Sequence, residues 1–357
     1  MTQSQIVTII GTGCAGLSLA KAIGQDKLAA LQLSTDKPAD QRPAHIWGFW
    51  QMPWLSEAAE LATASYAQWH IITEEMTIAH HSKDHPYQML SSKTWLAHCL
   101  TIAGCDETIA PVTTLPEPPY FDSRPIAPPK EALYQHFLGQ HICAADDIFD
   151  DKTAILMDFR CDQSNGLHFI YLLPTSPHTA LVESTLFTAT PLDEAYYKDA
   201  ITAYMARHYA GTSYQVTSQE KGIIPLADCR DASHPNHAIG ARGGALRPSS
   251  GYAFSFIQKQ IAQIIAHFKK TGQWHAASPI SKRDYWMDSV FLHVLKKHPA
   301  IAITLFAKMA KALNGTEFAL FMSGMASWRI ILKVVLAMPK RPFLSAAMAL
   351  LLKGGRS

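Results

Sequence analysis

Three glycines close to the N-terminus have the spacing that binds a pyrophosphate. They lie in the stretch Gly-Thr-Gly-Cys-Ala-Gly at residues 11–16, which matches the G-x-G-x-x-G fingerprint. The first glycine allows a tight turn, the second lets backbone N–H groups approach the phosphates, and the third lets helix and strand pack closely. We predict a dinucleotide site at Gly11, Gly13, Ala15 and Gly16. A purely structural glycine turn is the alternative.

A strand and a helix must position this turn. Residues 5–10 form a β-branched run for one buried strand, and residues 17–23 have helical spacing. The positive end of the helix dipole then faces the phosphates. A Rossmann unit usually ends its second strand, here residues 28–33, with an acid that holds the ribose. Ser34 stands at that place and Asp36 two positions later, so Asp36 or the backbone is predicted to make the ribose contact.

Aromatic residues gather after the second strand. Trp47, Phe49 and Trp50 lie in His-Ile-Trp-Gly-Phe-Trp at residues 45–50. Such a cluster forms a packed core, or it forms a wall for a flat flavin ring or a long apolar ligand. A metal centre is not expected, because His80, His81 and His85 have no second cluster that completes a four-ligand set.

The composition describes a globular chain with an uneven charge. With 357 residues, about two domains are expected, and a net charge of +2 gives no reason to expect a nucleic-acid partner. After Glu317 the chain has six basic residues and no acidic one, so this tail carries +6 and the rest −4. Six cysteines without a CxxC pair indicate reduced thiols in a cytoplasmic chain with no signal peptide. The sequence has no uninterrupted run of 18 apolar residues, so no membrane-spanning helix is expected.

The middle of the chain is rich in strands and the end in helices. Residues 110–130 contain seven prolines and are predicted to be a surface linker or extended loop. Short apolar runs separated by turn residues follow up to residue 187 and predict a meander sheet, before a helix at residues 196–209. A second glycine-rich turn at residues 239–251 leads into a helix at residues 254–268. Beyond Arg283 the pattern is helical.

At this point the motifs resemble those of the bacterial lycopene β-cyclases, the FAD-dependent enzymes of carotenoid synthesis. The resemblance extends over most of the chain and rests on an ordered set of stretches. These are GTGCAG at Gly11, HIWGFW at His45, LYQHFLGQHI at Leu133, LMDFRCDQ at Leu156, FIYLLP at Phe169, ALVEST at Ala180, GIIPL at Gly222, IGARGGALRPSSGYAFSFIQ at Ile239, DSVFLHVL at Asp288 and FMSG at Phe321.

The resemblance implies a Rossmann-like FAD-binding domain with an inserted, mainly antiparallel sheet domain for the substrate and a helical C-terminal region. The expected bounds are 1–110 and 221–275 for the FAD-binding domain, 111–220 for the linker and sheet, and 276–357 for the helices. It also implies an isomerase that closes the ψ-ends of an acyclic, lycopene-like carotenoid into β-ionone rings with no net redox change. Reduced FAD is required, with NADPH as the electron source.

The same resemblance assigns site residues. The second glycine segment becomes the distal FAD-binding turn, with Gly243, Gly244, Arg247 and Gly251 at the phosphates or the ring. Glu183 of ALVEST matches the position of the acid in the family. Asp158 and Arg160 of MDFR match another family motif and are included as catalytic candidates, although a plain structural ion pair is the alternative.

The chemistry explains why these residue types are needed. Proton addition to the terminal C=C gives a tertiary carbocation, which the neighbouring C=C attacks before a proton is lost. Burial would keep Glu183 protonated by raising its pKa. A dry site strengthens charge interactions, and aromatic faces add cation–π attraction of about 0.5–2 kcal/mol. Sequence candidates for these faces are Trp47, Phe49, Trp50 and Tyr252.

The basic tail predicts where the enzyme works, and two rival functions remain. A C40 hydrocarbon dissolves only in membrane, so the stretch 329–352 is expected to attach peripherally to the inner face of an anionic membrane, with buried globular helices as the alternative. The first rival function is a flavin-dependent oxidoreductase or monooxygenase on an apolar substrate, and the second is a non-catalytic flavin- or carotenoid-binding protein.

Overall fold

The computed structural model describes residues 6–37, 41–110 and 112–354. The chain divides into two compact units. The first comprises residues 1–62, 90–129 and 228–282, and the second residues 63–89, 130–227 and 283–357. The sequence placed all of residues 1–110 in one domain. Residues 63–89 instead belong to the second unit, because β5 (Gln68–Ile72) pairs in parallel with β11 (Thr153–Asp158).

The first unit is built on a parallel sheet of four strands in the order β8-β2-β1-β9. Their bounds are β1 (Ile6–Ile10), β2 (Ala30–Thr35), β8 (Glu107–Ile109) and β9 (Tyr120–Asp122). The two predicted strands are confirmed, although Gln5 lies outside the described residues. The proline-rich stretch was expected to be only a linker or loop. Its three residues between Pro119 and Ser123 form β9, because they carry the N–H and C=O groups that pair with β1.

Three helices of the first unit meet at one hydroxyl group. They are α1 (Cys14–Gln25), α3 (Ser92–Ala103) and α5 (Phe254–Thr271), and the predicted helices at residues 17–23 and 254–268 are thereby confirmed. The Ser18 hydroxyl of α1 accepts hydrogen bonds from Trp95 Nε1 at 2.9 Å and from Gln258 Nε2 at 2.8 Å. Smaller elements complete the unit, namely β3 (Ile46–Trp50), a 3₁₀ turn (Pro53–Leu55) and α2 (Ser56–Glu60).

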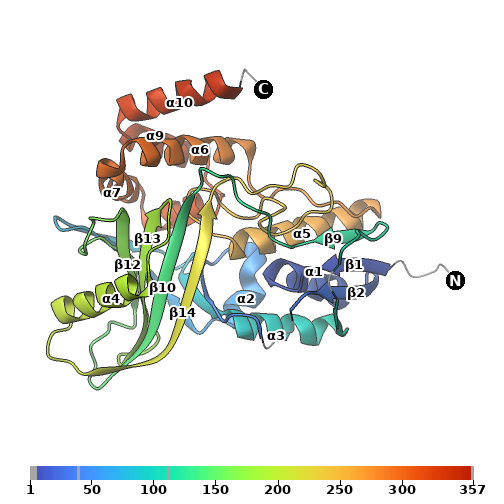
Figure 1. Cartoon of the computed structure of the whole chain (residues 1–357), viewed down its shortest axis with the longest axis horizontal. Helices are drawn as coiled ribbons and strands as arrows, with labels where there is room; N and C mark the ends of the chain where they lie inside the picture. Colours follow the sequence, from blue (N-terminus) through green and yellow to red (C-terminus); the bar gives the residue numbers. More distant parts are fainter. Residues whose placement is uncertain (1–5, 38–40, 111, 355–357) are drawn as a thin grey trace. The chain divides into compact units, whose positions relative to one another are not determined.

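The second unit is built on a seven-stranded sheet in the order β14-β10-β13-β12-β11-β5-β6. β10, β13, β12 and β11 pair antiparallel, as expected, and β14 pairs antiparallel with β10 along its length (Figure 1). The expected meander holds for β11 to β13, but β10 lies between β13 and β14. The further bounds are β6 (Thr77–His81), β10 (Leu133–Ala144), β12 (Leu167–Pro174), β13 (Thr179–Thr188) and β14 (Tyr214–Leu226). In a separate small sheet, β4 (Ala64–Tyr66) pairs antiparallel with β7 (Tyr87–Ser91).

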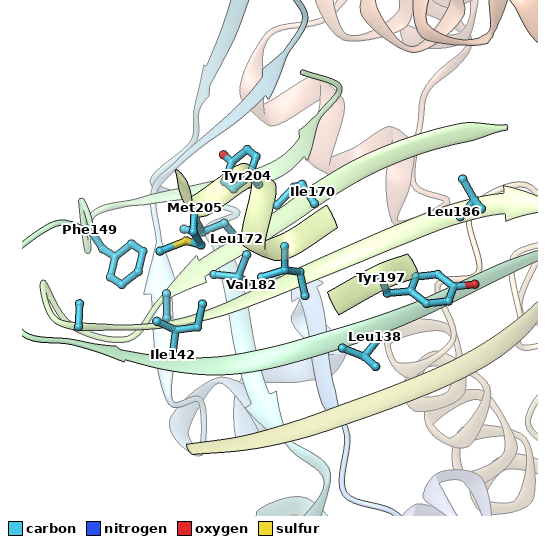
Figure 2. Close-up of a cluster of buried hydrophobic side chains, with 13 residues drawn as sticks. Leu138, Ile142, Phe149, Ile170, Leu172, Val182, Leu186, Tyr197, Tyr204 and Met205 are labelled. Carbon is cyan, nitrogen blue, oxygen red and sulfur yellow. The ribbon is translucent and has the colours of Figure 1, made fainter. Parts of the chain in front are cut away.

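One face of this sheet is covered by α4 (Glu194–His208), the predicted helix. Tyr197, Tyr204 and Met205 of α4 point onto a buried apolar cluster on β10, β12 and β13 (Figure 2). Side chains alternate between the two faces of a strand. Because Val182 and Leu186 of β13 face α4, the residues between them, including Glu183, point to the opposite face.

The C-terminal region is helical, as predicted. Its helices are α6 (Lys282–Lys297), α7 (Ala302–Ala312), α8 (Gly315–Met322), α9 (Trp328–Ala337) and α10 (Lys340–Gly354), with a 3₁₀ turn (Pro299–Ile301) between the first two. The α8 helix begins at a capping box, in which the Asn314 side chain accepts from Glu317 N while the Glu317 carboxylate accepts from Asn314 N. Arg356 of the basic tail lies outside the described residues.

Candidate functional site

The first glycine turn joins β1 to α1, the context that the fingerprint requires. Gly11 has a φ of +86°, a conformation that favours glycine, and its N–H donates to the Ser34 carbonyl at the end of β2. A Cβ added to Gly16 would lie 1.9 Å from the Gly11 carbonyl oxygen. The turn can therefore close against the helix only with glycine at position 16.

The N-terminus of α1 is open where the turn ends. Gly13 is its N-cap, which makes no side-chain capping bond, and a Cβ added there would meet no described atom within 4 Å. Beside it, Arg42 Nη2 donates to the Thr12 hydroxyl at 2.7 Å and forms an ion pair with Glu107. Sequence reasoning missed Arg42, which lies 30 positions from Thr12 in the chain and has no motif around it. The turn thus offers free backbone N–H groups and a cation nearby.

The second glycine segment lies against the first. Ala238 forms a parallel bridge with Asp122 of β9, which brings the following residues to the end of the same sheet. A Cβ on Gly240 would lie 2.8 Å from the Ala15 Cβ, and one on Gly243 would lie 2.2 Å from the Ala238 carbonyl oxygen. The sequence prediction that the two glycine stretches act together is thus consistent with their contact.

The segment then makes a tight turn around Arg247. The Arg247 carbonyl accepts from Gly251 N at 2.9 Å, and both Gly244 and Gly251 have positive φ values, of +78° and +70°. Arg247 is buried. The Ser250 hydroxyl oxygen is shielded from water and has no hydrogen-bond partner among the described residues. A buried hydroxyl without a partner costs free energy, which fits a site that a bound molecule completes.

The ribose candidate lies where the second strand ends. Ser34 is buried within β2, whereas Asp36 follows the strand and is exposed. The pKa of Arg124 is raised mainly by its hydrogen bond to Asp122, and the negative charge of Asp36 adds to this rise. An exposed carboxylate in this place can accept ribose hydroxyls, so Asp36 stays a prediction.

The four aromatic pocket candidates pack around α5 in the first unit. Trp47 stacks on Phe254 with ring centroids 4.9 Å apart, and Phe49 lies 5.1 Å from the same ring. The ring centroids of Trp50 and Tyr252 are 5.4 Å apart. Phe49 and Trp50 are buried, as the alternative of a packed core requires. A substrate contact by Trp47 or Tyr252 stays a prediction.

Glu183 lies in the middle of β13 and is buried. Burial raises the pKa of Glu183 to about 8, the charge of Glu220 adds to this rise, and the Thr185 hydroxyl, which donates to Glu183 Oε1, opposes it. On the same face, Phe187 packs edge-on against Phe169 of β12, with ring centroids 5.7 Å apart. The carboxyl group is thus protonated near neutral pH on an aromatic and apolar face, which is the environment that the sequence predicted for an acid.

A second carboxyl group lies close to the first. Gly139 of β10 is paired with Glu183 on one side and with Glu220 of β14 on the other. A Cβ on Gly139 would lie 3.6 Å from the Glu183 Cβ and 3.2 Å from the Glu220 Cγ, so both side chains extend over the glycine. Glu220 is also buried. Sequence reasoning missed Glu220, because only the strand register brings it to Glu183.

Asp158 and Arg160 are brought together, but on the other face of the sheet. The fully buried Asp158 carboxylate accepts from Arg160 Nε at 2.9 Å, Arg160 Nη2 at 2.6 Å and the Tyr204 hydroxyl of α4 at 2.9 Å. Its hydrogen bonds tie the end of β11 to the covering helix. This is the geometry of the structural ion pair that the sequence left open, and a catalytic role for Asp158 and Arg160 stays a prediction.

Solved structures of low sequence identity share the fold. A geranylgeranyl bacteriochlorophyll reductase-like protein from Thermoplasma acidophilum is 11% identical with a TM-score of 0.60, over 96% of this chain and 99% of the other. A flavin-dependent brominase is 14% identical with a TM-score of 0.53, over 99% of this chain and 100% of the other. The fold is therefore the Rossmann-like fold of flavoproteins, as predicted.

Sequence comparison gives the family. Residues 108–348 match the model of the family described as lycopene cyclase protein. The lycopene β-cyclase of Paracoccus sp. is 33% identical over 37% of this chain and 36% of its own length. The lycopene β-cyclase of Pantoea ananas is 27% identical over 56% of this chain and 55% of its own length. The chain thus spans about a third to about half of the length of these curated relatives. Because the family match covers more than half of the chain, the protein belongs to the lycopene cyclase family.

Proposed function

We propose that this protein is a lycopene β-cyclase, an FAD-dependent isomerase that closes the ψ-ends of an acyclic carotenoid into β-ionone rings without net redox change. The observation that carries the proposal is the buried Glu183 carboxyl, protonated near neutral pH, on an apolar face of a lycopene cyclase family member. Membership supports a carotenoid as the substrate class, and the carboxyl supports the proposed chemistry.

The reaction begins with the Glu183 proton. The carboxyl O–H adds its proton to the terminal C=C, the electron pair of the broken O–H bond stays on Glu183, and the neighbouring C=C attacks the resulting tertiary cation. Loss of a proton from the new ring restores neutrality. Phe169 and Phe187 lie on the face of Glu183 and can each stabilise a nearby cation by about 0.5–2 kcal/mol. Apolar surroundings also exclude water, which would otherwise capture the cation.

The cofactor site is proposed to be the pair of glycine turns. The residues at Gly11, Gly13, Ala15 and Gly16 would hold the pyrophosphate of FAD, and the open helix N-terminus and the Ser250 hydroxyl without a partner support this fit. The second turn would contribute Gly243, Gly244, Arg247 and Gly251, and Asp36 the ribose contact. Bound and reduced, with NADPH as the electron source, FAD would supply negative charge that can stabilise a carbocation.

Expression in a lycopene-accumulating bacterium tests the activity. Pigment chromatography is expected to show β-carotene or γ-carotene with the wild-type chain and only lycopene with Glu183→Gln. The matched control is Glu194→Gln, which removes an exposed surface carboxylate of the same unit and should leave the products unchanged. Unaltered lycopene with a folded, flavin-loaded wild-type protein would contradict the proposal.

NADPH consumption separates the proposed isomerase from its rivals. A cyclase needs only catalytic reduction of the flavin, so far less than one NADPH per ring is consumed. A flavin-dependent oxidoreductase or monooxygenase would consume one per turnover. A non-catalytic binding protein would give no product, and its pigment phenotype would be the same with glutamate or glutamine at position 183.

We also propose that the C-terminal helices attach the enzyme to the inner face of an anionic membrane. In the part of the chain that the structure describes, no single helix is long and apolar enough to cross a bilayer; two strongly bent pairs, residues 282–312 and 328–352, reach that length and composition only together. The face that α9 and α10 leave exposed is nonetheless apolar. It carries Trp328, Leu332, Val335, Leu336, Leu344, Met348, Leu351 and Leu352.

Charge supports the same surface. Arg329 and Arg341 flank the exposed apolar residues and Glu317 is the last acidic residue of the chain, so an anionic leaflet complements it. Substituting Leu336 and Leu344 with glutamate should abolish co-sedimentation with liposomes that contain anionic lipid. The matched control, Ile223→Glu on exposed β14, should bind like wild type. Equal binding by all three proteins would contradict membrane attachment through α9 and α10.

A further inference from the structure

We propose that Glu220 is a positioning residue for Glu183: the two carboxyl groups share one proton across Gly139, and His141 connects the pair to solvent. This inference rests on the proposed function, since it explains how Glu183 is kept protonated and is reprotonated after each turnover. It concerns only residues of β10, β13 and β14 in the second unit.

The sheet register is the first support. Glu183 and Glu220 both face Gly139, one from each neighbouring strand. Adjacent strands are about 4.8 Å apart, so any residue larger than glycine at position 139 would stand between the carboxyl groups. A Cβ there would approach the Glu220 Cγ to 3.2 Å and the Leu181 Cδ1 to 2.9 Å. The glycine thus lets two acidic side chains extend over it on one face.

Burial is the second support. Glu183 and Glu220 are each 8% exposed. Two carboxylates that extend over one glycine on a buried face repel each other, which opposes ionisation of Glu183 and supports a proton held by the pair. The charge of Glu220 contributes to the raised pKa of Glu183, after burial itself. A proton held by the pair is available at the pH at which an isolated glutamate would have lost it.

The remaining titratable groups on this face identify the entry point. On strands β10, β12, β13 and β14 they are His141, Cys143 and Tyr171, besides the two glutamates. The hydroxyl of Tyr171 is hydrogen-bonded to that of Tyr87 at 2.8 Å, and Cys143 lies at the end of β10. His141 Nε2 is 4.0 Å from Glu220 Oε2, and its side chain is 29% exposed. Of these groups, His141 is the one that is both partly exposed and within 4.0 Å of a carboxylate of the pair.

The proton path balances at each transfer. Once the 4.0 Å between His141 Nε2 and Glu220 Oε2 closes to a hydrogen bond or is bridged by one water, an imidazolium proton moves to Glu220, which leaves neutral imidazole and a neutral carboxyl group. Glu220 then passes a proton to the Glu183 carboxylate, which has just protonated the substrate. His141 regains a proton from solvent, and the proton lost from the new ring is released to solvent, so the cycle consumes no net proton. No oxidant, reductant or further reactant takes part.

The test reads the carboxyl proton itself. In the flavin-loaded protein without carotenoid, the infrared C=O stretch of the protonated Glu183 carboxyl should titrate near pH 8 and be absent from Glu183→Gln. In Glu220→Gln the midpoint should move to lower pH, because one negative charge is lost. The matched control Glu194→Gln should titrate like wild type. In His141→Gln the hydrogen–deuterium exchange of the band should slow by about 100-fold, as when a positioned proton donor is removed.

Two results would overturn the inference. One is a midpoint that stays the same in Glu220→Gln; the other is exchange in His141→Gln as fast as in wild type. If Glu220→Gln does not fold, Glu220→Asp keeps the charge and should move the midpoint less than an engineered Gly139→Ala, which separates the pair. Because these bands are measured without substrate, a shift in a protein that fails to cyclise lycopene would reject the proposed function and leave the shared proton standing.

Discussion

The first glycine turn and the Glu183 carboxyl are specified by the chain in opposite ways. The turn is local: Gly11, Gly13 and Gly16 lie within six positions and are held by the strand before them and the helix after them. Glu183 has no local motif of that kind, and its protonation depends on strands that are far apart in the sequence. The glycine turn can be recognised from its spacing alone, whereas Glu183 needs the family resemblance and Glu220 is found only through the strand register.

The largest expected effect is at the turn. Gly16→Ala places a Cβ 1.9 Å from the Gly11 carbonyl oxygen, a backbone atom that cannot move aside. We expect a loss of about 5 kcal/mol in the free energy of unfolding, or no folded protein, since such clashes belong to the most damaging class. Denaturant titration of the flavin-free protein measures it.

Gly13→Ala is the matched control within the same turn. Its added Cβ meets no described atom within 4 Å, so the free energy of unfolding without flavin should change by less than about 1 kcal/mol, as for glycine and alanine at an N-cap. FAD binding should nevertheless weaken, because the methyl group occupies the approach of the phosphates. Equal destabilisation by the two variants would show that the turn has no open side.

The second expected effect is on the pH dependence of stability. Because the pKa of Glu183 is about 8 when folded and the ordinary pKa of a glutamate is 4.5, the folded state binds an extra proton between these two pH values. Wild-type stability should therefore fall as pH rises from about 4.5 to 8, by about 5 kcal/mol in all, at about 1.4 kcal/mol per pH unit. Glu183→Gln has no such proton, so its advantage over wild type should grow across this window. A constant difference between pH 5 and pH 8 would contradict a buried, protonated Glu183.

These two regions also show what sequence could predict. The β1–turn–α1 unit, the strands from β10 to β13, α4, α5 and the helical C-terminus were all predicted from local patterns. Glu183 was assigned through the family resemblance, and its apolar neighbours were visible beside it. Glu220, Arg42 and Ser250 were not found, because their importance comes from contacts across strands or turns. The sequence did not predict β9, because this strand is only three residues long and lies within a proline-rich stretch that favours a loop.

A third effect compares the two faces of the large sheet. Asp158→Asn removes the charge that binds Arg160 and accepts from Tyr204, so we expect a loss of about 3 kcal/mol in the free energy of unfolding, as for a broken buried ion pair. Tyr204→Phe, which removes one hydrogen bond to the same carboxylate, should cost about 1 kcal/mol. Cyclisation per folded molecule should survive both changes. Lost activity with an unchanged unfolding transition would instead establish the catalytic role predicted for Asp158.

The smallest stability effect returns the comparison to the cofactor side. The Ser250 hydroxyl has no hydrogen-bond partner among the described residues, so Ser250→Ala should change the flavin-free stability by less than about 0.5 kcal/mol. FAD affinity should fall about tenfold, the value of one hydrogen bond of about 1.4 kcal/mol, as measured by flavin fluorescence titration.

Ser18→Ala is the matched serine control for that measurement. Its hydroxyl accepts from Trp95 and Gln258, and its loss leaves two buried donors without their acceptor, so we expect about 2 kcal/mol of destabilisation with FAD affinity of the folded protein unchanged. The two variants thus distinguish a hydroxyl that hydrogen-bonds to neighbouring helices from one that is proposed to hydrogen-bond to FAD. If Ser250→Ala destabilised the flavin-free protein as strongly as Ser18→Ala, the Ser250 hydroxyl would stabilise the folded chain itself. It would then no longer support FAD binding by the second glycine turn.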